Sequence, residues 1–187
     1  MIWMTKTFKK INSNLNITLH NYANNDEPCA GIYRGNTQEE QIFKQSNIHK
    51  YLTADLYPID KGNNLGCIYS NGVLFNDIKL NVVSIAALKV PRHKSLIIGN
   101  KHVYDYLYDE QKQIMSKKIH KLLRTCKNNG TDVLVTGLWG LGVFCNPIWG
   151  LTQIWNDCIK NSGIPIIIFV VQNDDRSKLF KEYIETT

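Results

Sequence analysis

Two adjacent glutamates, Glu39 and Glu40, are the residues of this sequence best suited to carry out chemistry. They follow Gln38 at the expected start of a helix. The segment before them, residues 16–22, alternates apolar and polar residues and predicts a strand, and a turn of small residues joins the two elements. Paired carboxylates beside a loop whose backbone can approach a ligand are what hydrolysis of a glycosidic bond requires.

A helix cap is the alternative explanation for the same segment. Thr37 and Glu40 have the spacing of a capping box, in which the glutamate side chain bonds back to the backbone before the helix. A cap does not require the second acid, Glu39. Both explanations stay open at this point.

A second loop, residues 137–147, is rich in glycine and lies between an expected strand and an expected helix. Its three glycines allow backbone N–H groups to surround an anion, and the dipole of the following helix would help. Phe144 could stack on a sugar or a base. The alternative is a tight strand-to-helix turn whose aromatic side chains belong to the core. Neither the P-loop pattern nor the Rossmann fingerprint fits this loop.

Strands that alternate with helices in the second half of the chain predict a largely parallel sheet covered on both sides. Residues 1–15 are basic and weakly patterned, which favours an irregular N-terminal arm or a short helix. The β-branched run at residues 164–171 predicts a strand buried on both faces. Asn146 and Pro147 predict a cap and a first-turn proline. We expect strands at residues 16–22, 65–69, 82–88, 131–136 and 164–171, and helices over residues 38–52, over 109–128, from 147 and after 174.

Composition narrows the class of protein. The 187 residues are most simply one domain, and the net charge of +6 suits either a polyanionic partner or solubility alone. Five cysteines without a C-x-x-C pair argue against a disulfide framework or a zinc site, and free thiols suggest a reducing compartment. The histidines are scattered, so we expect no metal and no cofactor. No apolar run is long enough for a signal peptide or a membrane span, and we expect a soluble, intracellular monomer, cytoplasmic or nuclear.

One expected helix, residues 109–128, carries a crowd of basic residues. Such a run is typical of a solvated helix face, and the alternative is a contact with the phosphates of a nucleic acid or another polymer. The residues are Lys112, Lys117, Lys118, Lys121, Arg124 and Lys127.

Four stretches, taken in order, make the sequence resemble the microbial-type poly(ADP-ribose) glycohydrolases, which have the macrodomain fold. They cover roughly residues 16–175. The first combines Asn21-Tyr22-Ala23, Glu27-Pro28-Cys29-Ala30-Gly31 and Gln38-Glu39-Glu40, and the others are Ile68 to Val73 with Phe75 and Asp77, residues 82–88, and residues 140–147. The resemblance implies a three-layer α/β/α fold with a mixed, largely parallel central sheet, formed by one domain over residues 1–187.

The resemblance also implies roles for individual residues. Glu40 would be the catalytic acid/base, Glu39 would hold the ribose hydroxyls, and Gln38 would support their placement. Three further sets would bind the substrate: Asn21 at the strand end, the turn from Gly31 to Gly35 at the diphosphate and distal ribose, and a second diphosphate loop of Gly140, Leu141, Gly142, Val143 and Phe144.

The sequence departs from the family pattern next to this site. Glu27 stands in place of an asparagine, and Cys29 and Ala30 replace two glycines, so side chains stand where the family presents bare backbone. We therefore expect a reduced or retargeted hydrolysis of ADP-ribosyl linkages, in polymer or on protein. The alternatives are a non-catalytic module that reads or sequesters ADP-ribose and a basic nucleic-acid-binding domain.

Overall fold

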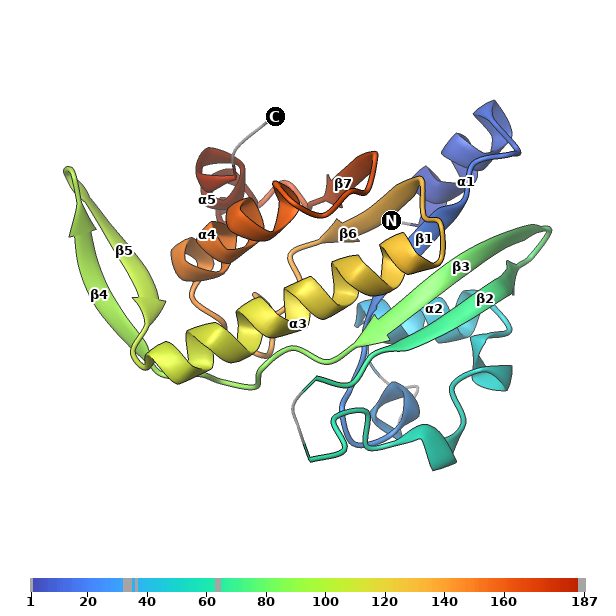
Figure 1. Cartoon of the computed structure of the whole chain (residues 1–187), viewed down its shortest axis with the longest axis horizontal. Helices are drawn as coiled ribbons and strands as arrows, with labels where there is room; N and C mark the ends of the chain where they lie inside the picture. The colour runs from blue at the N-terminus through green and yellow to red at the C-terminus, as the bar shows by residue number, and fades with distance from the viewer. Residues whose placement is uncertain (1, 32–34, 36, 63–64, 185–187) are drawn as a thin grey trace.

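A computed structural model describes residues 2–31, 35, 37–62 and 65–184 of the chain. A five-stranded sheet lies between two layers of helices (Figure 1). The helices are α1 (Ile2–Ile11), α2 (Gln38–Gln45), α3 (Asp109–Asn128), α4 (Ile148–Ile159) and α5 (Asp175–Tyr183), with short 3-10 turns η1 (Pro28–Gly31), η2 (Ile48–Lys50) and η3 (Ala54–Leu56). The strands are β1 (Ile17–Tyr22), β2 (Ile68–Phe75), β3 (Ile78–Ile85), β4 (His93–Ile98), β5 (Lys101–Tyr106), β6 (Val133–Gly137) and β7 (Ile166–Val170).

The strand order of the main sheet is β2-β3-β1-β6-β7. Every neighbouring pair is parallel except β2 and β3, which are antiparallel. This confirms the prediction of a mixed, largely parallel sheet. Because β1 and β6 are parallel neighbours, the loops that follow them leave the same edge of the sheet.

Apolar residues on the two faces of the sheet form two separate cores. Val82 packs with the residues beside α2, whereas its neighbour Val83 packs with α3 and α4. Side chains of a strand alternate between faces, so one strand serves both cores. Therefore α2 covers one face of the sheet and α3 and α4 cover the other face, as the three-layer prediction requires.

Several predicted elements need correction. Residues 2–11 form a helix, so the irregular arm is wrong and the short helix is right. The helix expected over residues 38–52 ends at Gln45 and is followed by η2. The run predicted to be buried on both faces is β7, which is only partly buried because it is the last strand of the sheet.

The β4–β5 hairpin was not predicted. It forms its own two-stranded sheet and projects from the body of the molecule (Figure 1). Ile97 and Tyr104 are exposed there. Across the described residues, no helix is both long and apolar enough to cross a membrane.

Candidate functional site

A cavity of about 720 Å³ lies at the carboxyl ends of β1, β6 and β7. It brings together α2, with Thr37 before it, and the glycine-rich loop after β6, which are about a hundred residues apart in the chain. Residues from both segments that were predicted to act together line it: Gln38 from α2, and Gly140, Gly142, Val143 and Phe144 from the glycine-rich loop.

Asn146 fixes the shape of the glycine-rich loop. Its Nδ2 donates to the carbonyl oxygens of Leu88 at 2.8 Å and Gly140 at 3.1 Å, and its Oδ1 accepts from the Tyr106 hydroxyl at 2.9 Å. Asn146 is thus not the predicted helix cap, since Pro147 occupies the N-cap position of α4 without a side-chain bond. The amide instead holds the loop that faces the cavity.

The two glycines of this loop have different requirements. Gly140 has a φ of 81°, which disfavours any other residue, and a Cβ there would lie 3.0 Å from Asn146 Nδ2. A Cβ on Gly142 would meet no atom within 4 Å. The backbone at Gly142 therefore borders open space in the cavity, where a ligand can approach it.

Gln38 ties the start of α2 to β1. Its Oε1 accepts from the Tyr22 backbone N–H at 2.9 Å, and its Nε2 donates to the His20 carbonyl at 2.7 Å. Because the oxygen and the nitrogen of the Gln38 amide each form a hydrogen bond, the orientation of the side chain is fixed. This geometry suits the predicted supporting role of Gln38.

Glu39 is buried beneath the loop that follows β1. Its Oε2 accepts from the Asn24 backbone N–H at 2.9 Å, and its Oε1 lies 3.4 Å from the Asn21 Nδ2. The Asn21 amide also donates to Ser84 Oγ at 3.1 Å, which links β1 to β3. Burial is the main reason that the pKa of Glu39 rises to about 7, and the hydrogen bonds oppose that shift. Glu39 therefore exchanges a proton near neutral pH.

Glu40 forms the capping box. Its Oε2 accepts from the Thr37 backbone N–H at 2.9 Å, the Thr37 Oγ1 accepts from the Glu40 N–H, and Gly35 N–H donates to Glu40 Oε1 at 2.8 Å. The backbone hydrogen bonds hold the pKa of Glu40 below its usual value. The cap explanation is confirmed for Glu40, while Glu39 takes no part in the cap.

Neither glutamate carboxyl is among the described groups that line the cavity. Thr37 and Gln38, which immediately precede them, do line it. Both glutamates are buried, with 4% and 6% of their surface exposed. The two glutamates therefore follow lining residues directly in the chain, and their carboxyls are buried and do not face open solvent.

The predicted turn from Gly31 to Gly35 is described only at its ends. Gly31 closes η1, and residues 32–34 and 36 lie outside the described residues. Cys29 has a φ of 57°, a left-handed backbone that favours glycine. Its side chain is buried in the core beside α2, and burial raises the pKa of the thiol to about 11. Cys29 therefore keeps a glycine-like backbone while its side chain packs in the core, and the raised pKa leaves the thiol protonated at neutral pH.

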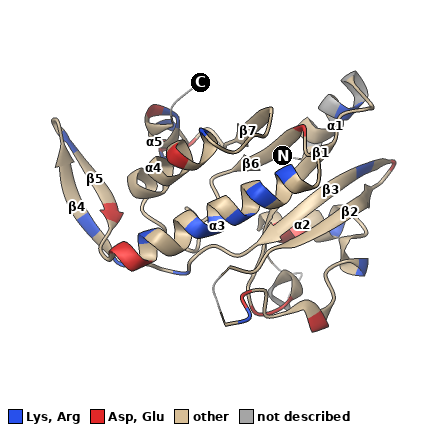
Figure 2. Ribbon diagram, viewed as in Figure 1, with Lys and Arg blue, Asp and Glu red and all other residues tan. Residues whose placement is uncertain are grey.

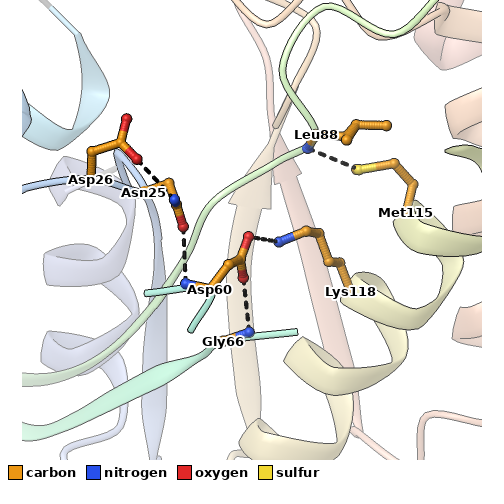
Figure 3. Close-up of polar contacts among 7 residues, drawn as sticks. All are labelled: Asn25, Asp26, Asp60, Gly66, Leu88, Met115 and Lys118. Carbon is orange, nitrogen blue, oxygen red and sulfur yellow. Dashed lines mark hydrogen bonds and ion pairs between the residues drawn. The ribbon is translucent and has the colours of Figure 1, made fainter. Parts of the chain in front are cut away.

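A buried ion pair anchors the loop that follows β1 (Figure 3). Lys118 Nζ lies 2.6 Å from Asp60 Oδ2, and the Asp60 N–H donates to Asn25 Oδ1 at 2.9 Å. Asn25 follows Asn24, whose N–H binds Glu39. The chain of contacts therefore runs from α3 to the candidate site. Lys118, only 1% exposed, does not belong to the predicted solvated face.

Arg176 was missed by the sequence reasoning. It lies on α5, lines the cavity, and donates from Nη1 to the Leu141 carbonyl at 3.3 Å. Its other nitrogen, Nη2, pairs with Asp174 at 3.1 Å. Its position just after β7 was the available signal, because ligands bind beyond the carboxyl ends of such strands. Arg176 thus brings a guanidinium to the cavity, and Asp174, which also lines the cavity, balances its charge.

The cavity is also lined by Trp139 and by Tyr22, of which Tyr22 was not predicted as a site residue. The Trp139 ring lies 5.0 Å from that of His20, which is fully buried. Burial lowers the pKa of His20 to about 3, so this imidazole stays neutral at physiological pH. Among the described residues, no three His, Cys, Asp or Glu side chains are placed to hold a metal ion.

Comparison with known proteins identifies the fold. No protein-family model matches the chain, and no curated protein matches it. Solved structures do. The poly(ADP-ribose) glycohydrolase of Thermomonospora curvata superposes with a TM-score of 0.75 and 17% identity, covering 98% of this chain and 73% of that one. The chain has the fold of the microbial poly(ADP-ribose) glycohydrolases.

A second similar structure is that of the Deinococcus radiodurans glycohydrolase in complex with ADP-ribose. It matches with a TM-score of 0.69 and 18% identity, over 96% of this chain and 79% of that one. The T. curvata enzyme bound to the inhibitor ADP-HPD matches with a TM-score of 0.74 and 17% identity, over 97% of this chain and 75% of that one. The resemblance inferred from four short stretches is thus confirmed at the level of the fold. Identities this low leave the activity to be argued from the site.

Proposed function

We propose that this protein binds ADP-ribose in the cavity and hydrolyses ADP-ribosyl O-glycosidic linkages. The observation that carries the proposal is the convergence of Gln38 and the glycine-rich loop on one cavity, with two buried glutamates directly after Gln38 in α2. The fold is shared with glycohydrolases, one of which is solved with ADP-ribose bound.

The cavity suits the parts of ADP-ribose. A volume of about 720 Å³ is within the usual range for a small-molecule site. The open backbone at Gly142 and the Arg176 guanidinium, whose charge is shared with Asp174, would favour a diphosphate. Phe144, which also lines the cavity, would pack against a ribose.

The glutamate pair would supply the reaction. A carboxylic acid gives its proton to the leaving oxygen as the bond between that oxygen and the anomeric carbon breaks. The resulting carboxylate then takes a proton from the water that adds to the anomeric carbon. We assign this cycle to Glu40, and to Glu39 the binding of the ribose hydroxyls.

The protonation states of the two acids fit these assignments in part. Glu40 without ligand is a carboxylate, which is the form that activates water. A bound diphosphate would raise its pKa by like-charge repulsion and so favour the proton-donating form. Glu39, with a pKa of about 7, is protonated below neutral pH and can then donate a hydrogen bond to a ribose hydroxyl.

A non-catalytic ADP-ribose-binding module is the second proposal. The observation that favours it is that both oxygens of Glu40 are held by backbone N–H groups in the cap. A carboxylate used in this way has a structural role of its own.

Incubation with poly(ADP-ribose) and with mono-ADP-ribosylated protein, followed by chromatography of free ADP-ribose, tests the proposal. We expect ADP-ribose to be released by the wild type and its release to fall at least a hundredfold in Glu40→Gln, with binding retained. Binding without release by the wild type would favour the second proposal. Undiminished release by Glu40→Gln would refute the assigned role.

A further inference from the structure

A second hollow, of about 670 Å³, lies beside the C-terminal half of α3. The described residues that line it include no Asp or Glu. Figure 2 shows basic residues at intervals along α3 and acidic residues only at its start. The basic residues that line the hollow are Lys117, His120, Lys121, Arg124 and Lys127.

The cations of this hollow are not neutralised by a carboxylate of the described chain. Two other lysines of α3 do have such partners, since Lys112 pairs with Asp105 and Lys118 with Asp60. The four Lys and Arg residues that line the hollow form no ion pair with a described residue. Three of the four are exposed and Lys121 is half-buried. Their charge is available to a partner.

The spacing of the four cations suits a polymer of phosphates. They occur at intervals of four, three and three residues, which places them on one side of the helix. A rise of 1.5 Å per residue makes this row about 15 Å long, with one cation about every 5 Å. A lone phosphate could contact only one or two of them, whereas a nucleic-acid backbone presents charge along the whole row.

The lining of the hollow also distinguishes a duplex from a single strand. Proteins that hold single strands stack bases on aromatic side chains. The described lining contains no Phe, Tyr or Trp. A backbone contact without base stacking is what a duplex allows.

The hollow is remote from the cavity at the candidate site. The end of α3 lies beside the start of β1, where Asn16 Nδ2 donates to the carbonyls of Asn129 and Gly130 at 2.8 Å. The cavity lies at the other end of β1, beyond Tyr22. A strand of this length spans about 17 to 20 Å. Both places can therefore be occupied together.

We propose that the row formed by Lys117, Lys121, Arg124 and Lys127 binds the phosphate backbone of a nucleic-acid duplex, without base specificity and independently of the cavity. Four phosphate contacts correspond to a slope of about −3.6 in a plot of log K against log salt. This inference does not depend on the glycohydrolase proposal.

Fluorescence anisotropy with a labelled DNA duplex of random sequence, between 50 and 200 mM salt, tests the inference. The test variant is Lys117→Gln/Arg124→Gln/Lys127→Gln, which removes three exposed cations from the row. We expect its salt slope to be shallower by about 2.7 and its affinity at 100 mM salt to fall at least tenfold.

The matched control is Lys50→Gln/Lys79→Gln/Lys89→Gln, which removes three exposed lysines that lie elsewhere. We expect it to bind within threefold of the wild type, and both variants to keep the circular dichroism spectrum and melting temperature of the wild type. Equal losses in the two variants would mean that net charge alone drives binding and would overturn the inference. The inference would also be overturned if the wild type did not bind the duplex at 50 mM salt, or if it bound a single strand more tightly than the duplex.

Discussion

Replacement of Glu39 by glutamine should change how the stability of the protein depends on pH. The wild-type carboxyl is 4% exposed, and burial raises its pKa from an ordinary 4.5 to about 7. A raised pKa means that the folded state binds the proton more tightly than the unfolded state. The resulting stability is fully present below pH 4.5 and is lost as the pH rises through 7.

The size of the effect follows from the shift. One pKa unit corresponds to about 1.4 kcal/mol, so the whole shift is worth about 3 kcal/mol, of which about 2.5 kcal/mol falls between pH 5 and pH 8. Glutamine has nearly the same shape and carries no charge at either pH. The free energy of unfolding of Glu39→Gln, relative to the wild type, should therefore rise by about 2.5 kcal/mol from pH 5 to pH 8.

Urea unfolding of both proteins at the two pH values measures this difference. His20, whose pKa is lowered to about 3, also makes stability depend on pH, but its contribution cancels because both proteins contain it. Glu40→Gln is the control, because a carboxyl with a lowered pKa is ionised at pH 5 and at pH 8 alike. A constant difference between wild type and Glu39→Gln across this range would refute the assignment of a raised pKa.

Three other substitutions have defined outcomes. Gly142→Val should leave the melting temperature within a few degrees of the wild type and weaken ADP-ribose binding at least tenfold by calorimetry, because its Cβ enters open cavity space. Gly35→Ala should lower the unfolding free energy by about 1–2 kcal/mol in urea, because its Cβ would lie 2.6 Å from Glu40 Oε2 and disturb the cap. Lys118→Met should cost about 3–5 kcal/mol in the same assay by leaving Asp60 unpaired, and adding Asp60→Asn should restore part of the loss. Unchanged ADP-ribose affinity in Gly142→Val would contradict the first prediction, and an unchanged unfolding free energy in Gly35→Ala would contradict the second. The third would be contradicted if the losses of unfolding free energy from Lys118→Met and Asp60→Asn simply added in the double variant.

Local sequence patterns predicted the elements whose structure is decided locally. The helix over residues 109–128 was predicted with its bounds, because apolar residues at helical spacing and Asn129-Gly130 define both its face and its end. The capping box was predicted because Thr37 and Glu40 are three residues apart. The edge position of β7 was not predicted, because a β-branched sequence is the same whether the strand lies in the centre of a sheet or at its edge.

Contacts between distant segments decided what the sequence did not predict. Lys118 and Asp60 are 58 residues apart, and only the fold brings them together. A weak signal existed, because Lys118 lies between Met115 and Ile119 on the apolar side of α3. The raised pKa of Glu39 likewise depends on burial beneath the loop after β1, which spacing alone does not reveal.

Calorimetric titration of the protein with free ADP-ribose tests the central claim most directly, with Gly142→Val as the paired sample. The account predicts saturable one-site binding by the wild type and its loss in the variant, at equal thermal stability. No heat and no thermal shift in the wild type, or equal binding by both proteins, would contradict it.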